Sequence, residues 1–311
     1  MNAHPPIFSS ENMPETTAAL RPVVSIDSKL LDTGKPLFDR VSQDCSALTT
    51  KAYSTSFSLG IRMLSPELRA PIQAVYGFVR FADEIVDTFH DFDKEELFKR
   101  FKADTHLAIQ EGISLNPILN SFQWAFHTYE MDIAHVDKFL ESMELDLDQT
   151  AYDREGYDDY IVGSAEVVGL MCLSIFVKGD KEQYDALLPH ARSLGAAFQK
   201  INFLRDLRAD WAGLGRTYFP GLSLDGFDFE AKQSIEAEIE ADFAHALEGI
   251  LRLPKTSRLG VYMAYVYYTR LFQKIKRLPH SRILEDRIRI PNRQKALLLM
   301  GSYVRHQFNL L

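Results

Sequence analysis

The sequence predicts an all-α protein that folds as one large domain. Helical periodicity dominates from about Leu37 onward, and almost no segment alternates apolar and polar residues as a strand would. Hydrophobic residues make up 46% of the 311 residues and are spread evenly over the same region, which indicates one continuous core. Proline and asparagine interrupt the periodic segments at places where helices would begin.

The first part of the chain differs from the rest. Residues 1–36 are rich in Pro, Ser, Thr and Asn without periodicity, so we predict a disordered leader that cannot bury enough apolar surface to become ordered. The folded domain is then predicted to comprise residues 37–311. Its helices are predicted, in order, over residues 37–64, 66–89, 94–111, 117–129, 136–150, 157–177, 181–210, 229–251, 258–278 and 291–307.

Local signals support several of these boundaries. Ser65-Pro66 and Asn116-Pro117 each place a proline in the first turn of a predicted helix, where its missing N–H is tolerated. Pro279 follows the Lys/Arg-rich end of the helix predicted before it. The connections are short except for a glycine-rich loop over residues 211–228, directly after the helix predicted over 181–210. Such a loop could cover a site at that helix end.

Charge and cysteine content exclude several classes of protein. The net charge of -8 and the pI near 5.6, without a basic stripe, argue against a nucleic-acid-binding protein. Cys45 and Cys172 show no metal-ligand or CxxC spacing, so we expect reduced thiols and a cytoplasmic protein. No secretory signal precedes Arg21, and the longest apolar run, residues 167–177, is shorter than the roughly 20 residues of a spanning helix. We expect no membrane span, whereas a greasy substrate or product would allow peripheral membrane contact.

Two acidic ladders, far apart in sequence, point to chemistry. Asp83 and Asp87 stand four residues apart in one predicted helix, and Asn202, Asp206 and Asp210 repeat that spacing in another. Residues at this spacing share a helix face, where like charges repel by roughly 0.2–0.5 kcal/mol per pair. A solvated acidic face would explain one ladder alone, but two ladders in apolar surroundings indicate a cation between them. Because Mg²⁺ takes one or two protein carboxylates and completes its shell with phosphate oxygens and water, the pattern predicts a metal-diphosphate site.

Four ordered motifs are similar to those of the squalene/phytoene synthase family. They are residues 53–57 (YSTSF), 76–87 (YGFVRFADEIVD), 160–169 (YIVGSAEVVG), and 199–210 (QKINFLRDLRAD) followed by 215–220 (GRTYFP). The similarity extends from about residue 40 to the end of the chain, and the motifs most resemble those of bacterial phytoene synthases. It implies an all-α isoprenoid synthase fold, a helical bundle in which two aspartate-rich helices face each other across a central cavity.

The resemblance also implies roles for individual residues. The residues that would hold Mg²⁺, or Mn²⁺ in its place, are Asp83, Asp87, Asn202, Asp206 and Asp210. The residues that would contact the substrate or its phosphates are Ser54, Ser56, Phe57, Tyr76, Arg80, Gln199, Asn202, Arg205, Tyr268 and Arg293. Tyr160 would lie near the diphosphate or the carbocation. For each tyrosine taken alone, a packed core residue with a satisfied hydroxyl is the simpler interpretation.

The activity that the resemblance implies is head-to-head coupling of two geranylgeranyl diphosphates through a cyclopropylcarbinyl diphosphate to phytoene, with Mg²⁺ and without NADPH. The nearest alternatives are dehydrosqualene or squalene synthesis from farnesyl diphosphate. A terpene cyclase would space the ligands of its second motif differently from Asn202, Asp206 and Asp210. A non-catalytic assembly protein on the same fold would not need all four aspartates.

Glu166 departs from the family pattern, which usually has a small residue lining the cavity at this position. An unpaired buried carboxylate is costly, so the side chain is expected to be paired, to point outward or to be functional. The group that removes the last proton of the reaction stays open among Tyr160, Glu166 and a diphosphate oxygen.

Overall fold

A computed structural model describes residues 33–148, 151–209, 218–220, 227–284 and 288. Every element in these ranges is a helix, which confirms the all-α class. The helices are α1 Gly34–Tyr53, α2 Thr55–Arg62, α3 Pro66–Asp87, α4 Lys94–Glu111, α5 Pro117–Thr128, α6 Ile133–Leu145, α7 Arg154–Ile161, the π-helical segment η2 Val162–Glu166, α8 Val167–Phe176, α9 Lys181–Ala209, α10 Phe229–Arg252, α11 Lys255–Lys276 and α12 His280–Ile283. Residues 1–32 of the predicted leader 1–36, the helix predicted over 291–307 and most of the 211–228 loop lie outside the described residues. The last residues of the predicted leader belong to α1, which begins at Gly34.

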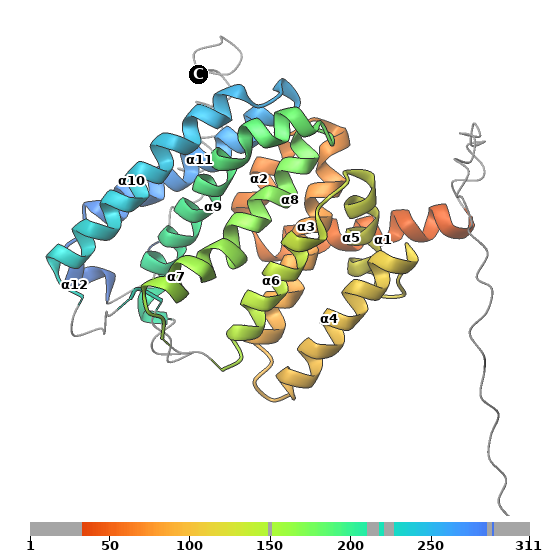
Figure 1. Ribbon diagram of the computed structural model, residues 1–311, viewed down its shortest axis with the longest axis horizontal. Coiled ribbons are helices and arrows are strands. Elements are labelled where there is room, and N and C mark those ends of the chain that lie inside the picture. The colour runs from red at the N-terminus through yellow and green to blue at the C-terminus, as the bar shows by residue number, and fades with distance from the viewer. Residues whose placement is uncertain (1–32, 149–150, 210–217, 221–226, 285–287, 289–311) are drawn as a thin grey trace, which may run out of the picture.

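The helices form a bundle with α8 and α9 in its middle (Figure 1). α10 packs along α9 on one side, and α11 contacts both α9 and α10. On the other side α3 packs against α8, and α1, α4 and α5 pack against α3 in turn. This arrangement places the two helices that carry the acidic ladders, α3 and α9, on opposite sides of α8.

The single helix predicted over residues 37–64 is wrong, because the chain breaks at Ser54. Ser54 has extended backbone angles, φ -142° and ψ 108°, so α1 ends at Tyr53 and α2 begins at Thr55. The Ser54 hydroxyl accepts a hydrogen bond from the Phe57 N–H at 3.1 Å, a side-chain cap that stabilises the new helix start. The break turns α2 toward α11, and Phe57 on α2 thereby reaches the aromatic side chains of the site described below.

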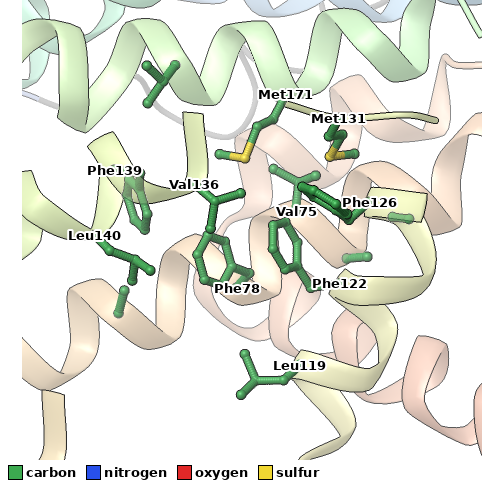
Figure 2. Packing of buried hydrophobic residues seen from close by; sticks show 14 of the residues in the cluster. Val75, Phe78, Leu119, Phe122, Phe126, Met131, Val136, Phe139, Leu140 and Met171 are labelled. Atoms are coloured by element: carbon green, nitrogen blue, oxygen red, sulfur yellow. The ribbon is translucent and has the colours of Figure 1, made fainter. Parts of the chain in front are cut away.

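The largest hydrophobic core lies between α3, α4, α5, α6 and α8 (Figure 2). Phe78 on α3 is fully buried, with its ring stacked 4.0 Å from Phe122 and 5.3 Å from Phe139. Proline at the start of α3 and of α5 fits the sequence prediction, and Asn116 caps α5 by accepting from the Ile118 N–H at 3.0 Å. This core fixes α3, the helix that carries Asp83 and Asp87.

α7, η2 and α8 form one continuous helix, Arg154–Phe176, which is longer than the apolar run counted in the sequence. The helix has 23 residues, and its most apolar window has a mean hydropathy of 1.5. Among the described residues it is the one helix that is long and apolar enough to cross a membrane. Half of that window is buried inside the fold, as in the core helix of a bundle. The apolar run counted in the sequence forms the second part of this helix, and the more polar turns of α7 precede it.

Gly163 allows the π-helical segment to approach α6. A Cβ atom at this position would lie 1.8 Å from the Ser142 Oγ and 2.8 Å from the Lys138 carbonyl oxygen. The backbone oxygen cannot rotate away, so we expect Gly163→Ala to lower the free energy of unfolding by about 1–3 kcal/mol. Denaturant titration followed by circular dichroism measures the change.

The matched control for this prediction is Gly60→Ala on α2, where the nearest atom to a new Cβ is 3.4 Å away. Because alanine is the better helix former, this variant should be as stable as the wild type or slightly more stable. A Gly163→Ala protein as stable as Gly60→Ala would contradict the proposed close approach of η2 and α6.

Candidate active site

An elongated cavity of about 280 Å³ runs between α2, α3, α8, α9, α10 and α11. Nearly all of its lining side chains are apolar. Four of its polar lining residues, Ser164, Gln199, Asn202 and Tyr268, are joined by hydrogen bonds, and we call the part of the cavity that they line the mouth. The part about 18 Å from Asn202 along α9, which we call the deep end, is lined by Leu187, His190, Gly249 and Leu253. A cavity of this kind accepts a long apolar chain with a polar group at the mouth.

The first acidic ladder lies on α3, where Asp83 follows the cavity-lining residue Val79 by one helical turn. Arg80 donates from Nη1 to the Asp83 Oδ2 at 2.5 Å and from Nη2 to the Glu84 carboxylate. Its guanidinium carbon lies 4.5 Å from the centre of the Tyr53 ring, a cation-π contact. The remaining donor, Arg80 Nε, is buried without a hydrogen-bond partner. A buried guanidinium donor without a partner suits a phosphate oxygen.

The surroundings of the Asp83 carboxyl disfavour its negative charge. Burial among protein atoms is the main cause that raises its pKa to about 7, Asp87 one turn away raises it further, and Arg80 opposes both. The side chain keeps 36% of its surface accessible, so water also solvates the carboxylate. An additional cation near Asp83 and Asp87 would lower the pKa of Asp83 and stabilise the charged ladder.

The second ladder lies on α9. Gln199 donates to the Ser164 hydroxyl at 3.3 Å, and Asn202 donates to the Gln199 Oε1 at 3.4 Å. Arg205 donates to the Asp206 carboxylate from Nη2 and from Nε, and Nε lies 3.0 and 3.1 Å from the two carboxylate oxygens. Asp206 is thus oriented by its neighbour in the sequence, and the α9 face presents two amides, a carboxylate and a guanidinium on one stripe.

Aromatic side chains connect the two ladders. The Phe57 ring lies 6.0 Å from Tyr76 on α3 and 6.2 Å from Tyr268 on α11. Tyr268 stacks on Phe198 of α9 at 4.0 Å and donates its hydroxyl proton to the Asn202 Oδ1 at 3.3 Å. Burial is the main cause that raises the pKa of Tyr76 to about 12, so its hydroxyl stays protonated and serves as a donor. The structure therefore joins residues that the sequence predicted as substrate-binding from four different helices.

Tyr160 lies in a buried aromatic cluster rather than in the cavity wall. It is 3% exposed, and its ring packs 5.2 Å from Tyr218 and 5.0 Å from Tyr152. Its hydroxyl donates to the Asp146 Oδ2 at 2.6 Å, and burial followed by the charge of Asp146 raises the pKa of Tyr160 well above its usual value. A tyrosine in this state is a proton donor, so it is a poor base for the last step of the predicted reaction.

Asp146 is a residue that the sequence analysis missed. It is 5% exposed at the end of α6, accepts hydrogen bonds from Tyr160 and from Tyr152, the latter at 3.4 Å, and its charge adds to the upward shift of the Asp83 pKa. The sequence carries one signal that could have identified Asp146, a charged residue within the apolar-periodic stretch 136–150 that periodicity predicts as one helix. Instead α6 ends at Leu145, and Asp146 is its C-cap.

Several predicted site residues are not brought together. Among the residues that the structure describes, no three His, Cys, Asp or Glu side chains form a group that could hold a metal ion by themselves. Asp210 and Arg293 lie outside the described residues. Ser56 lies on α2, partly buried, beside Phe57.

Glu166 pairs with Arg192 Nε at 2.5 Å and does not line the cavity. Of the three alternatives for this side chain, the paired one is therefore confirmed.

A pH dependence of stability follows from Asp83. Its pKa is higher in the folded protein, about 7, than the ordinary value of 3.8, so folding is favoured by the protonated carboxyl. This contribution is fully present below about pH 4 and is lost as the pH rises through about 7. With a chelator present, we expect the melting temperature of the wild type to fall between pH 5 and pH 8 by more than that of Asp83→Asn.

Differential scanning fluorimetry of both proteins across this range measures the two changes in melting temperature. Subtracting one change from the other removes the contribution of every titrating group that the two proteins share. Adding Mg²⁺ at pH 8 should raise the melting temperature of the wild type more than that of Asp83→Asn, because a ligand that binds the folded state stabilises it. Parallel melting curves for the two proteins would contradict the stated environment of Asp83.

The fold and the cavity define an all-helical protein with a largely apolar cavity and with carboxylates, amides and guanidinium groups on the two helices beside it. The model of the squalene/phytoene synthase family matches residues 50–294, and the chain belongs to this family. The predicted family membership is therefore confirmed.

Individual relatives are similar at modest identity. The chain is 29% identical over 194 residues to 4,4'-diapophytoene synthase of Staphylococcus haemolyticus, a match that covers 62% of this chain and 65% of that protein. It is 28% identical over 276 residues to phytoene synthase of Cereibacter sphaeroides, with 80% and 75% covered. Presqualene diphosphate synthase of Zymomonas mobilis is 29% identical over 257 residues, 81% of each chain. The match to the first of these relatives spans slightly less than two thirds of its length.

The structure also resembles solved structures. A dehydrosqualene synthase crystallised with a ligand superimposes with a TM-score of 0.75 over 86% of this chain and 98% of the other, at 19% identity. At this identity the likeness shows the fold alone. It confirms the predicted helical bundle around a central cavity.

Proposed function

We propose that this protein is a phytoene synthase, which couples two geranylgeranyl diphosphates head to head. The observation that carries the proposal is the apolar cavity between α3 and α9, whose lining residues Val79 and Asn202 lie four residues before Asp83 and Asp206 on their helices. Membership of the family supports the class of reaction, and the relative from Cereibacter sphaeroides supports the C20 substrate. The relatives named 4,4'-diapophytoene synthase and presqualene diphosphate synthase support other members of the same class, so substrate length is decided by experiment.

The residues at the mouth fit Mg²⁺ together with a diphosphate. Mg²⁺ keeps most of its water and usually takes only one or two carboxylates, which Asp83 and Asp87 would supply on α3 and Asp206 on α9. Mg²⁺ beside Asp83 would balance a negative charge that burial and the neighbouring Asp87 disfavour. Bound metal supplies one kind of chemistry here, neutralisation of the charge on a leaving diphosphate. The same donor set would accept Mn²⁺.

The protein's own residues position the reactants and exclude water. Arg80, with its unpartnered Nε, and Arg205 would pair with diphosphate oxygens, and the Tyr76 hydroxyl would donate to them. The apolar wall would shield an allylic carbocation from water, while the aromatic faces of Phe57 and Phe198 would attract it by about 0.5–2 kcal/mol each. In the proposed route the second prenyl chain attacks this cation through its alkene and loses a proton, which the first released diphosphate can accept, as the cyclopropane ring closes. The cyclopropylcarbinyl diphosphate then loses its own diphosphate and rearranges.

The last step of the proposed reaction releases a proton, for which the cavity wall offers no carboxylate among the described residues. Glu166 is engaged by Arg192, and Tyr160 is a donor to Asp146. The leaving diphosphate held at the mouth is the remaining candidate base of those considered. No hydride is consumed on this route, so we propose that NADPH is not required.

The experiment that tests the proposal is product analysis with the purified full chain. We expect Mg²⁺ and geranylgeranyl diphosphate alone to give phytoene and two diphosphates per turnover, as measured by mass spectrometry and a diphosphate assay. A C30 hydrocarbon from farnesyl diphosphate as the main product would replace the C20 assignment, and a dependence on NADPH would indicate a squalene synthase. A cyclic terpene, or no reaction with either substrate, would overturn head-to-head coupling.

The same incubation with phospholipid vesicles tests the proposed peripheral membrane contact for product release. Sedimentation should carry part of the protein with the vesicles, and product should collect in the lipid. Protein that stays entirely in the supernatant at every lipid concentration would remove membrane contact from the proposal.

A further inference from the structure

One polar side chain stands in the apolar deep end of the cavity, far from the mouth. His190 and Asn202 both line the cavity from α9, about 18 Å apart along the axis at about 1.5 Å per residue. The lining residues Leu187, Ile250 and Leu253 belong to one buried apolar cluster. A histidine in such a wall is costly unless both of its ring nitrogens have partners.

Both nitrogens of His190 are held by groups outside the cavity wall. Nδ1 lies 2.8 Å from the His245 carbonyl oxygen of α10, which can only accept, so Nδ1 carries the proton. Nε2 lies 3.2 Å from Arg252 Nη1, which can only donate, so Nε2 supplies its lone pair. These two partners fix one neutral tautomer and one ring orientation. The ring therefore cannot swing aside as a leucine of similar size could.

The helix packing also leaves the ring no room to retreat. A Cβ atom on Gly249 would lie 2.2 Å from the His190 Cβ, so α9 and α10 are in close contact here. The His245 ring packs on the other side with its centre 4.3 Å from that of His190. His190 is partly buried: it lines the cavity, and its Nε2 meets the exposed Arg252. It therefore lies between the deep end and the surface of the molecule.

We propose that His190 is the residue that limits the length of the prenyl chain that the cavity accepts. The inference rests on the proposed function and names the structural element that sets its substrate length. A diphosphate fixed at the mouth leaves its apolar tail extended along α9 toward the deep end, where the fixed imidazole stops it. A longer tail would have to displace a ring that two hydrogen bonds and close helix packing hold in place.

The test compares how fast wild type and variants consume C15, C20 and C25 prenyl diphosphates, by release of diphosphate with Mg²⁺ present. We expect His190→Ala to raise the rate with C25 relative to C20 at least tenfold over wild type, because the deep end opens. We expect His190→Trp to shift the preference from C20 toward C15. Unchanged ratios in both variants, with C20 still consumed, would overturn the proposal.

The matched control is His245→Ala, which removes a neighbouring ring of the same kind that does not line the cavity. The His245 carbonyl that holds His190 is retained, so the C25 to C20 ratio should stay within twofold of wild type. A shift as large as that of His190→Ala would assign the effect to general loosening of α9 and α10 and so contradict the proposal.

A second measurement needs no variant and no turnover. C15 and C20 prenyl diphosphates with a photoreactive diazirine at the tail end are irradiated with the wild-type protein and Mg²⁺, and the labelled residues are identified by mass spectrometry. The C20 probe should label residues 187–191 or 249–253, and the C15 probe should label residues nearer the mouth. A C20 label confined to the mouth would overturn the role of His190, whereas correct labels without product would leave it standing and count against the proposed function alone.

Discussion

Asp83→Ala and Asp206→Ala should each lower kcat/KM at least 100-fold with the protein's prenyl diphosphate substrate. Each carboxylate is paired with an arginine and is not part of the hydrophobic core. A 100-fold loss corresponds to about 2.7 kcal/mol of transition-state stabilisation, a typical effect of removing one preorganised charge. Steady-state diphosphate release at saturating Mg²⁺ measures it.

Stability should respond differently from activity in these variants. Removal of Asp83 relieves repulsion by Asp87, so helical content and melting temperature in the absence of metal should stay near those of the wild type. Asp104→Ala, an exposed position on α4, is the matched control and should leave both activity and stability unchanged. Activity of Asp83→Ala or Asp206→Ala within tenfold of wild type would remove that residue from the metal-diphosphate site.

Phe78→Ala should cost the most stability, about 3–5 kcal/mol in the free energy of unfolding. The ring is fully buried between Phe101, Phe122 and Phe139, and its removal would leave a cavity in the tightly packed core shown in Figure 2. Because this core fixes α3, activity should fall together with stability. Urea titration followed by circular dichroism gives the difference in free energy.

Leu115→Ala provides the comparison for that measurement, since this leucine is 91% exposed. Its replacement should change the free energy of unfolding by less than about 0.5 kcal/mol. If Phe78→Ala and Leu115→Ala unfold at the same denaturant concentration, the assignment of the main core around α3 and α5 is wrong.

Local signals in the sequence predicted much of the fold correctly. The helix predicted over 94–111 has the bounds of α4, and those predicted to start at Pro66 and Pro117 begin there in the structure as α3 and α5. These boundaries depend on capping side chains and proline within one turn, which a reader of the sequence can see. The two ladders were predictable for the same reason, because a helix alone places residues four apart on one face.

The failures of prediction involve contacts between distant parts of the chain. Helical periodicity in the sequence continued across Ser54, so the break there was not predicted. The break accompanies a contact between distant parts of the chain, the approach of α2 to α11 at Gly60 and Gly260. The π-helical segment likewise lies where Gly163 meets α6. Asp146 was read as a helical position, and its pairing with Tyr160 became visible only once α6 and α7 were placed.

The sequence by itself determined the all-α class, the helices that carry the acidic ladders, and the family. Tertiary structure alone decided that Phe57, Tyr76 and Tyr268 join those ladders, that Glu166 turns to Arg192, and that His190 stands at the deep end of the cavity. The physical reason is the range of the interactions. Capping and helix periodicity act within a few residues, whereas the shape of a cavity depends on how side chains from six helices pack at once.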